Sequence, residues 1–264
     1  MDKLYLGIDI GGTHTRAVLL NGLKKQKPNC FVIDTLQNKK DFLDVLRKFI
    51  ESIIRGKKIT GLGAGLPGII DPKRGILSKA QNLPFLDGWD AEKFFKQFGA
   101  LAKIDNDCRC FLRAETEWGS AQGYKNVIGI AIGTGIGGGI MLEGKMYAGS
   151  HNSAGEFGHT IIDVVHEKTF EQLAAKKAFL QKGDTSTIIG IGVANLINIF
   201  DPEMVVLGGG GVTSGKIKIE VVKKSAQRYV VSPLSRKTLI VKGGLGETAQ
   251  AIGATLLFNF YKRY

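Results

Sequence analysis

Two segments of the chain, 122 residues apart, share a glycine-centred pattern that constrains the fold more than any other feature. Residues 7–20 and 129–142 each show an apolar strand, a glycine turn and a second apolar strand, with five of fourteen aligned positions identical. This period is longer than that of solenoid repeats. The repeat therefore predicts two similar α/β domains, each with a glycine turn, although two unrelated glycine hairpins would also give this pattern.

Between and beyond the repeats, strand and helix patterns alternate. Apolar residues at helical spacing predict an amphipathic helix over 41–54 and another helix over 247–261. The position of the second helix in the fold does not follow from its periodicity. Short apolar runs bounded by turn residues predict five strands, over 4–10, 15–20, 30–36, 60–66 and 101–104.

The formal net charge of +12 raises the question of a nucleic-acid partner. The lysines and arginines are scattered, however, and no basic run is interleaved with aromatic residues. We therefore expect a solvated basic surface, or one that attracts an anionic nucleotide, and no binding of nucleic acid.

The chain has the composition of a soluble protein with free thiols. The best membrane-span candidate, residues 126–142, is too short and contains six glycines. The three cysteines, Cys30, Cys108 and Cys110, form no disulfide framework, which favours a cytoplasmic protein. Cys108 and Cys110 are separated by one residue, which is too close for a usual zinc pair, although metal binding there is the alternative.

Three glycine-rich turns are candidates for binding phosphate, because backbone amides approach a phosphate closely only where no side chain intervenes. They are Gly11-Gly12-Thr13, Gly133-Thr134-Gly135 and Gly208-Gly209-Gly210-Gly211, and none fits the Walker pattern. The third follows an apolar strand, an arrangement that suits a nucleotide base or ribose against the main chain.

Asp9 lies within the otherwise apolar first predicted strand, two residues before the first turn. A buried carboxylate there is costly unless it meets a cation or hydrogen-bond donors. Binding of Mg²⁺ through water is one interpretation, and hydrogen bonds to the amides of the turn are the other.

Four motifs in order then resemble the signatures of the ROK family of sugar kinases, which includes glucokinases. They are Asp9-x-Gly-Gly-Thr-x-x-Arg16, Gly133-Thr-Gly-x-Gly-Gly-Gly139, Ala154-Gly-Glu-Phe-Gly-His159 and Asp201-Pro-Glu-x-Val-Val-Leu-Gly-Gly-Gly210. The resemblance covers nearly the whole chain. It implies an α/β, actin-like ATPase fold of two ribonuclease-H-like domains, with ATP and sugar in the interdomain cleft.

The same resemblance assigns the catalytic base. Ile104-Asp-Asn-Asp107 is similar to the Asn-Asp segment of the family, which makes Asp107 the general base and Asn106 a sugar contact. Asp107 stands between a predicted strand and a helix, so it can also cap that helix, and capping alone is the other interpretation. Asp105, two residues earlier, is the alternative candidate for the base; we favour Asp107, so Asp105→Asn is expected to have a mild effect.

The sugar-binding residues implied by the resemblance are Asn82, Glu156, His159 and, provisionally, Glu171. The family commonly continues from this histidine into a cysteine-rich zinc loop, but residues 161–169 contain no cysteine. We therefore expect no zinc site, and the identity of the sugar stays open.

Together these inferences predict an ATP-dependent hexose kinase acting on the 6-OH of glucose or a related hexose. Its domains would be 1–107 with 245–264, and 108–244. ATP would contact Gly11, Gly12, Thr13, Gly133, Thr134, Gly135, Gly209 and Gly210, with Mg²⁺ near Asp9. A homodimer is one option for its assembly. The rivals are a non-catalytic sugar sensor on the same scaffold and an activator-type ATPase.

Overall fold

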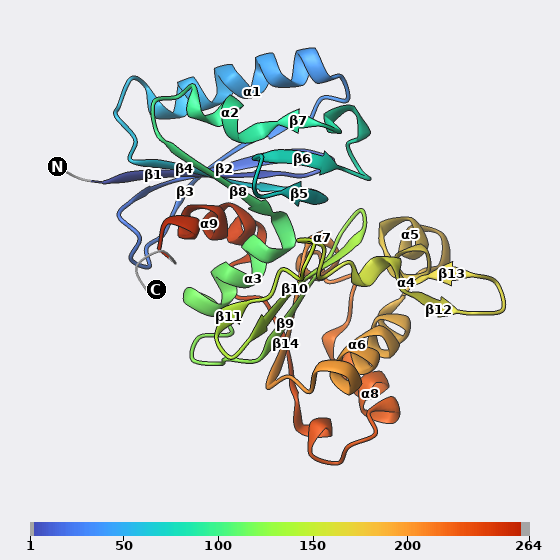
Figure 1. The fold of residues 1–264 in the computed structure, drawn as a ribbon. Coiled ribbons are helices and arrows are strands. Elements are labelled where there is room, and N and C mark those ends of the chain that lie inside the picture. Colours follow the sequence, from blue (N-terminus) through green and yellow to red (C-terminus); the bar gives the residue numbers. More distant parts are fainter. Residues whose placement is uncertain (1–2, 260–264) are drawn as a thin grey trace. The chain divides into compact units, whose positions relative to one another are not determined.

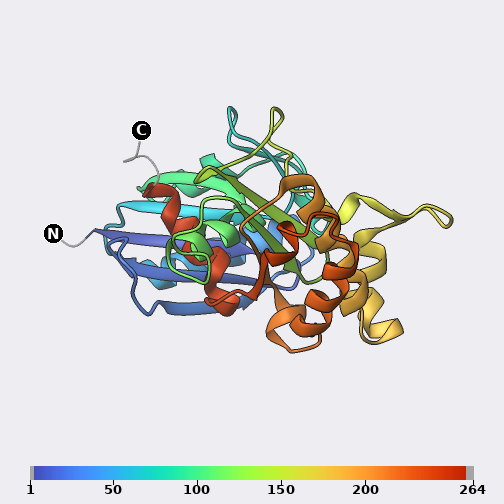
Figure 2. The ribbon, with the colours of Figure 1, turned by 90° about the horizontal axis from the view of Figure 1, so that it is seen from below.

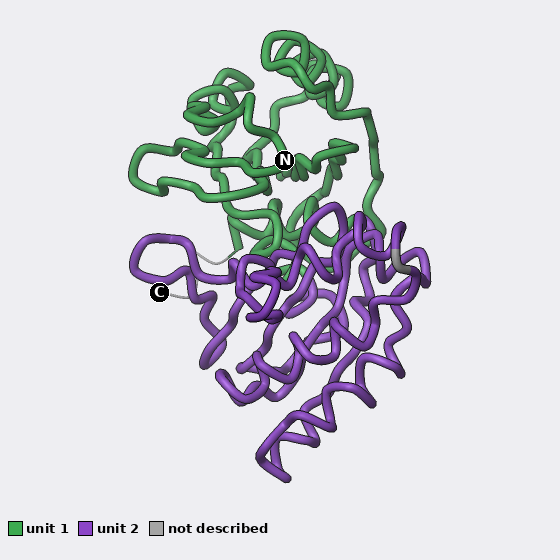
Figure 3. The backbone as a smooth tube through the Cα atoms, turned by 90° about the vertical axis from the view of Figure 1, so that its right-hand side faces the viewer, with its two compact units in different colours: residues 1–114, 248–264 green, residues 115–247 purple. Residues whose placement is uncertain are grey.

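The computed structural model describes residues 3–259, and the chain forms two compact units (Figure 3). The first unit contains residues 1–114 and 248–264, and the second contains residues 115–247. The division falls inside helix α3 (Asp107–Glu117), whereas the predicted boundary lies at the start of that helix. The domain limits predicted from the sequence stay a prediction.

The first unit is built on a five-stranded sheet with strand order β3-β2-β1-β4-β8. Strand β1 pairs antiparallel with β2 and parallel with β4, which in turn pairs parallel with β8. The five strands predicted in this region are all present, with ends that differ by a few residues. Their bounds are Leu4–Ile10 (β1), His14–Asn21 (β2), Asn29–Asp34 (β3), Gly61–Leu66 (β4) and Leu101–Asn106 (β8).

Helices cover both faces of this sheet, with α1 and α2 on one side and α9 and the start of α3 on the other (Figure 1). Helix α1 (Lys39–Ile54) confirms the predicted amphipathic helix. Its first turn is capped by the side chain of Asn38, which accepts a hydrogen bond from the backbone N of Asp41. The apolar stripe of α1 is buried in the core of the unit: Phe42, Leu46, Phe49, Ile50 and Ile53.

The C-terminal helix α9 (Ala249–Thr255) packs directly on β1 and β4. Glycines make this approach possible, because a Cβ at Gly63 would lie 1.9 Å from the carbonyl oxygen of Ala254. A Cβ at Gly7 would lie 2.0 Å from the oxygen of Ala251. The predicted helix over 247–261 is thus shorter than expected and ends in a 3-10 turn, η5 (Leu256–Phe258), while residues 260 and 261 lie outside the described part.

The second unit repeats the same strand arrangement, with order β11-β10-β9-β14-β15. Strand β9 pairs antiparallel with β10 and parallel with β14, as β1 does with β2 and β4. This equivalence supports a duplicated domain as the origin of the sequence repeat. The strands are Val127–Ile132 (β9), Ile136–Leu142 (β10), Lys145–Met146 (β11), Met204–Gly208 (β14) and Leu239–Lys242 (β15).

Helices α6 and α8 pack side by side in the second unit (Figures 1 and 2), and α6 lies against the core of the sheet. A short hairpin, β12–β13, projects from this unit. The helical elements of the unit are Phe157–His159 (η2), Phe170–Ala174 (α4), Lys176–Lys182 (α5), Ser186–Phe200 (α6), Gly210–Thr213 (α7), Ile219–Tyr229 (α8) and Ser235–Lys237 (η3).

The remaining short elements complete the two units. They are Ile69–Asp71 (β5), Ile76–Lys79 (β6), Pro84–Leu86 (η1), Trp89–Asp90 (β7), Ala91–Lys96 (α2), Ile161–Asp163 (β12), Lys168–Thr169 (β13) and Gly246–Thr248 (η4). Among the residues that the structure describes, no helix has the length and apolar character needed to cross a membrane.

Candidate active site

Asp9 occupies the end of β1, where its side chain is buried beside the first glycine turn. The residue is 5% exposed. Burial raises the pKa of Asp9 to about 8, and the negative charge of Asp107 adds to this rise while Arg16, its cross-strand neighbour, opposes it. The turn that follows is tight, since the backbone N of Gly11 donates to the oxygen of His14 at 3.0 Å.

Asp107 is the first residue of α3, but its neighbour Asn106 makes the capping contacts. The Oδ1 atom of Asn106 accepts from the backbone N of Cys108 (2.9 Å) and of Arg109 (3.1 Å). Its Nδ2 atom donates to the oxygen of Gly68 at 3.1 Å. The Oδ1 atom of Asp107 accepts from the N of Cys108 at 2.8 Å. Asn106, at the end of β8, therefore caps the helix, and Asp107 stands half-buried at its N-terminus.

The contacts of Asp105 argue against the expectation that Asn at this position has a mild effect. Its carboxylate accepts from Arg109 Nε and Arg113 Nη2, both at 2.6 Å, and the two guanidinium groups are buried. Replacement of one member of such a buried set leaves an uncompensated charge, which costs several kcal/mol, about 3–5. Asp105 lies near the end of strand β8 and the two arginines lie on helix α3, so the sequence analysis, which followed local patterns, did not identify this cluster.

Asn82 lies beside the first glycine turn. It belongs to the loop between β6 and η1 and is exposed. A Cβ at Gly12 would lie 3.8 Å from the Cβ of Asn82, so the turn and the predicted sugar-binding amide are neighbours. In the first unit, Asp9, the turn 11–13 and Asn82 thus lie at one end of the sheet. Strand β8 ends with Asn106 at the same end, and α3 begins there with Asp107.

The other two glycine turns meet at one end of the sheet in the second unit. Gly133, Thr134 and Gly135 connect β9 to β10, and Gly133 N donates to the Gly135 oxygen at 2.9 Å. Gly209, with a φ of 83°, follows β14, and a Cβ there would lie 2.5 Å from the oxygen of Ile132. A Cβ at Gly133 or at Gly210 would meet no atom within 4 Å, so the backbone is accessible at both positions.

The predicted sugar-binding residues of this unit surround the turn η2. Glu156 precedes η2 and His159 ends it, with 3.7 Å between His159 Nε2 and Glu156 Oε2. Glu171, in the first turn of α4, accepts a hydrogen bond from the backbone N of Ile136 at 2.8 Å. Glu171 therefore supports the start of β10, directly after the turn 133–135, in addition to any contact with a ligand.

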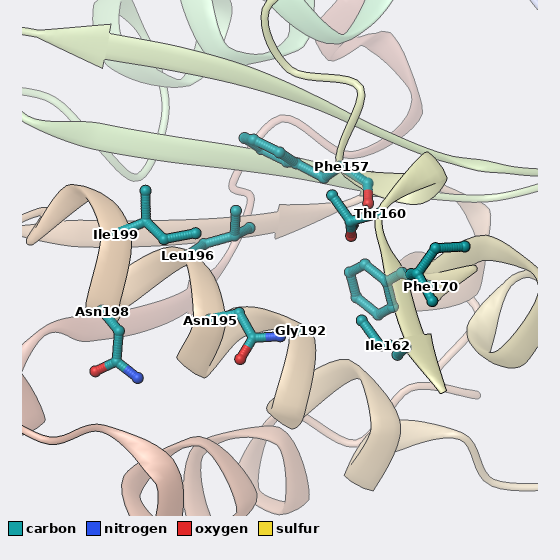
Figure 4. A pocket seen from close by; sticks show the side chains of 10 residues that line it. Phe157, Thr160, Ile162, Phe170, Gly192, Asn195, Leu196, Asn198 and Ile199 are labelled. Atoms are coloured by element: carbon teal, nitrogen blue, oxygen red, sulfur yellow. Dashed lines mark hydrogen bonds between the residues drawn. The ribbon is translucent and has the colours of Figure 1, made fainter. Parts of the chain in front are cut away.

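A cavity of about 350 Å³ lies behind η2, between the hairpin β12–β13 and α6 (Figure 4). Phe157, Thr160 and Phe170 line it from one side, and Asn195, Leu196 and Ile199 line it from α6. None of its lining residues is among the predicted sugar-binding or nucleotide-binding residues.

A second buried carboxylate, Glu115, was not identified from the sequence. Its oxygens accept from the backbone N of Ser120 (2.8 Å), Gly244 (2.9 Å) and Leu245 (3.0 Å). The side chain is fully buried, and these three donors offset the cost of its burial. Only the fold brings residues 115 and 244 together, so no local pattern could have revealed this contact.

The segment after His159, for which the family resemblance alone would imply a zinc loop, is held by other contacts. Hydrogen bonds from the side chain and backbone of His166 lower the pKa of Asp163, and His166 Nδ1 lies 2.9 Å from Asp163 Oδ2. Thr169 and Gln172 form a capping box at the start of α4. The described residues contain no group of three or more His, Cys, Asp or Glu side chains suited to a metal, and the three cysteines are free thiols.

We expect the purified protein to contain well under one zinc per chain, because a Cys₃His site needs three thiolates that this segment does not supply. Elemental analysis checks the content. Activity should survive chelation once Mg²⁺ is restored. Stoichiometric zinc, with unfolding on chelation, would contradict this prediction.

The donor set in the first unit fits a hard cation. Carboxylate oxygen is the ligand that Mg²⁺ prefers, and it commonly binds through retained waters. A nearby cation would favour the ionised form of Asp9, whose burial otherwise disfavours it. Asp9 could therefore hold Mg²⁺ through water, while the open glycine turns offer backbone amides to phosphate.

The fold of both units, a hairpin followed by two parallel strands, is that of the actin-like ATPases, as the sequence predicts. The structure is similar to a ROK family glucokinase from Streptomyces griseus in complex with glucose and AMPPNP. The TM-score is 0.87 at 23% identity, and the match covers 96% of this chain and 98% of the other.

The chain belongs to the ROK family, whose model matches residues 5–187 and 168–260. It is 26% identical to a glucokinase from Thermotoga maritima, covering 98% of each chain. It is also 26% identical to an N-acetyl-D-glucosamine kinase from Photobacterium profundum, over 96% of this chain and 99% of the relative. The recognition of the family from four motifs is therefore confirmed.

Proposed function

We propose that this protein is an ATP-dependent hexose kinase that phosphorylates the 6-OH of glucose or a related hexose. The observation that carries the proposal is the position of Asp107, half-buried at the start of α3 and close enough to Asp9 for its charge to raise the pKa of Asp9. The membership of the chain in the ROK family and its nearly full-length match to sugar kinases support the same activity.

In the proposed reaction, the sugar hydroxyl oxygen attacks the γ-phosphorus of ATP while the bond from phosphorus to the ADP oxygen breaks. Asp107 accepts the hydroxyl proton as the new bond forms. Bound Mg²⁺ would neutralise charge on the phosphates. Asp9 would hold its water ligands, and the amides of the glycine turns would bind the phosphate oxygens.

We assign the sugar hydroxyls to five polar side chains. Carboxylates, imidazole and amides are suitable partners for vicinal hydroxyls, because they offer both donors and acceptors. The contacts of Asn106 with the helix and Gly68, and of Glu171 with Ile136, hold those two side chains in fixed directions. The five side chains are Asn82, Asn106, Glu156, His159 and Glu171.

A coupled assay of ADP release across glucose, mannose, fructose, N-acetylglucosamine and N-acetylmannosamine tests the function. Release that depends on one of these sugars supports the kinase. Release of equal rate without sugar would indicate an activator-type ATPase. Sugar binding without ADP release would indicate a sensor.

Glu156→Ala should raise the dissociation constant of the sugar about 10- to 100-fold, since a hydrogen bond to a charged group contributes about 1.5–3 kcal/mol. ATP affinity should hardly change. Isothermal titration of the sugar and of a non-hydrolysable ATP analogue measures both effects.

The matched control is Glu220→Ala, a carboxylate of the same unit on α8 that is 84% exposed and pairs with Lys223. It should leave both affinities at the wild-type value. An unchanged sugar affinity in Glu156→Ala would remove Glu156 from its assigned role.

A further inference from the structure

Beneath the proposed base lies a buried cluster of three charged residues, Asp105, Arg109 and Arg113. Asp105 is the second-last residue of β8, and the two arginines follow on α3. Its Oδ1 atom accepts from Arg109 Nε at 2.6 Å, and its Oδ2 atom accepts from Arg113 Nη2 at 2.6 Å. The exposed fractions of the three side chains are 15%, 3% and 7%.

Stability alone gives little reason for such a cluster. A buried ion pair often contributes no more than an apolar replacement of the same shape, because both ions lose their hydration. Here one carboxylate faces two guanidinium groups. Burial acts to raise the pKa of Asp105, but Arg113 and Arg109 more than offset it and hold the pKa below its ordinary value. Asp105 is therefore an ionised acceptor of hydrogen bonds from both guanidinium groups.

Hydrogen bonds connect Asp105 to Asn106, Asn106 to Arg109, and Arg109 back to Asp105, so they enclose the segment that contains Asp107. Asp105 Oδ1 accepts from the backbone N of Asn106 at 2.8 Å. Asn106 Oδ1 accepts from the backbone N of Arg109 at 3.1 Å, and the side chain of Arg109 returns to Asp105. The backbone on both sides of Asp107 is thus held by one charged group.

We propose that Asp105 is a positioning residue that, with Arg109 and Arg113, sets the direction from which Asp107 meets the sugar hydroxyl. This inference rests on the proposed kinase function and adds to it a role that the family motif does not supply. Asp105 acts through the backbone of Asn106 and the first turn of α3, so it affects the rate of phosphoryl transfer more than the binding of either substrate.

Asp105→Asn keeps the shape of the side chain and removes its charge. We expect kcat to fall about 10- to 100-fold, because a displacement of about 1 Å at a catalytic group costs about that much. The KM values for sugar and ATP should change less than about twofold. Rates are measured well below the unfolding midpoint and per folded molecule, with the folded fraction taken from circular dichroism.

The double variant Asp105→Asn/Arg113→Met separates geometry from charge. It leaves one guanidinium and no carboxylate, so the net charge of the cluster equals that of the wild type. We expect the melting temperature to recover in part while kcat stays low. Recovery of kcat together with stability would overturn the positioning role, since burial of excess charge would then explain the single variant.

Two further variants complete the comparison. Ile50→Val, in the core of the same unit, should lower stability with no loss of kcat. Should Asp105→Asn fail to fold, Asp105→Glu keeps the charge and moves the carboxylate by one methylene, and it should show the same loss of kcat at unchanged KM.

Hydrogen exchange of the backbone amides of residues 106–109 gives a readout that needs no kinase activity. Exchange should become at least about tenfold faster in Asp105→Asn and stay unchanged in Ile50→Val. Unchanged exchange in Asp105→Asn would refute the positioning role. A wild-type protein without hexose-dependent ADP release would refute the proposed function, and the exchange rates would still decide whether Asp105 holds this segment.

Discussion

Asp107→Asn should lower the turnover number at least about 10²-fold, because the amide keeps the shape of the side chain but cannot accept the hydroxyl proton. The amide oxygen can still accept from the backbone N of Cys108, as the carboxylate does at 2.8 Å. The start of α3 should therefore remain intact, and sugar binding should change much less than turnover. The ADP-release assay and titration of the sugar measure the two effects.

Asp44→Asn is the matched control for this variant. Asp44 is an exposed carboxylate of the same unit, on α1 and away from β8 and α3. Its replacement should leave both turnover and affinity at the wild-type level. Near-normal turnover in Asp107→Asn would remove Asp107 from the role of base.

Gly63→Ala should destabilise the protein by about 3 kcal/mol or more, at the upper end of the usual cost of overpacking. The new methyl carbon would lie 1.9 Å from the carbonyl oxygen of Ala254 and 2.6 Å from its carbonyl carbon. Both are backbone atoms of α9, so no side-chain rotation relieves the contact and the helix must move away from the sheet. The melting temperature should fall by about 6–12 °C.

Gly133→Ala is the matched comparison, because Gly133 has open space where a Cβ would lie, whereas Gly63 is packed against a helix. A Cβ at Gly133 meets no atom within 4 Å, and the residue does not have a positive φ. The melting temperature should stay within about 2 °C of the wild type, while the KM for ATP rises about tenfold because the methyl group obstructs the approach of phosphate. If Gly133→Ala lowered the melting temperature as much as Gly63→Ala does, the assignment of a packing role to Gly63 and of a phosphate-binding role to Gly133 would be contradicted.

Local patterns were enough to predict the five strands of the main sheet in the first unit and the helix α1, although not the short strands β5, β6 and β7. In these segments the buried face is formed by residues that are close together in the sequence. In helix α1, for example, Phe42, Leu46 and Phe49 follow each other within two helical turns. The repeat predicted more than local structure, since it indicated two similar α/β domains, and the two five-stranded sheets indeed share one strand arrangement.

Contacts between distant residues were beyond the same reasoning. The approach of α9 to Gly63 depends on positions nearly 200 residues apart in the chain. Glu115 finds its donors at Gly244 and Leu245 for the same reason. At the candidate site, the sequence pointed to Asp9 and Asp107 and offered capping as a possible role of Asp107, whereas Asn106 makes the capping contacts. Asn106 and Asp107 have similar capping preferences, and only the backbone geometry decides between them.

The return of the chain to its first unit has a consequence for the order of folding during synthesis. The second unit is one continuous stretch, 115–247, whereas the first needs residues from 248 onward to cover β1 and β4. On the ribosome, the sheet of the first unit therefore emerges first but keeps the face under α9 uncovered until residues 249–255 have left the exit tunnel. The first unit, whose synthesis begins first, is thus completed only after all of the second unit has been made.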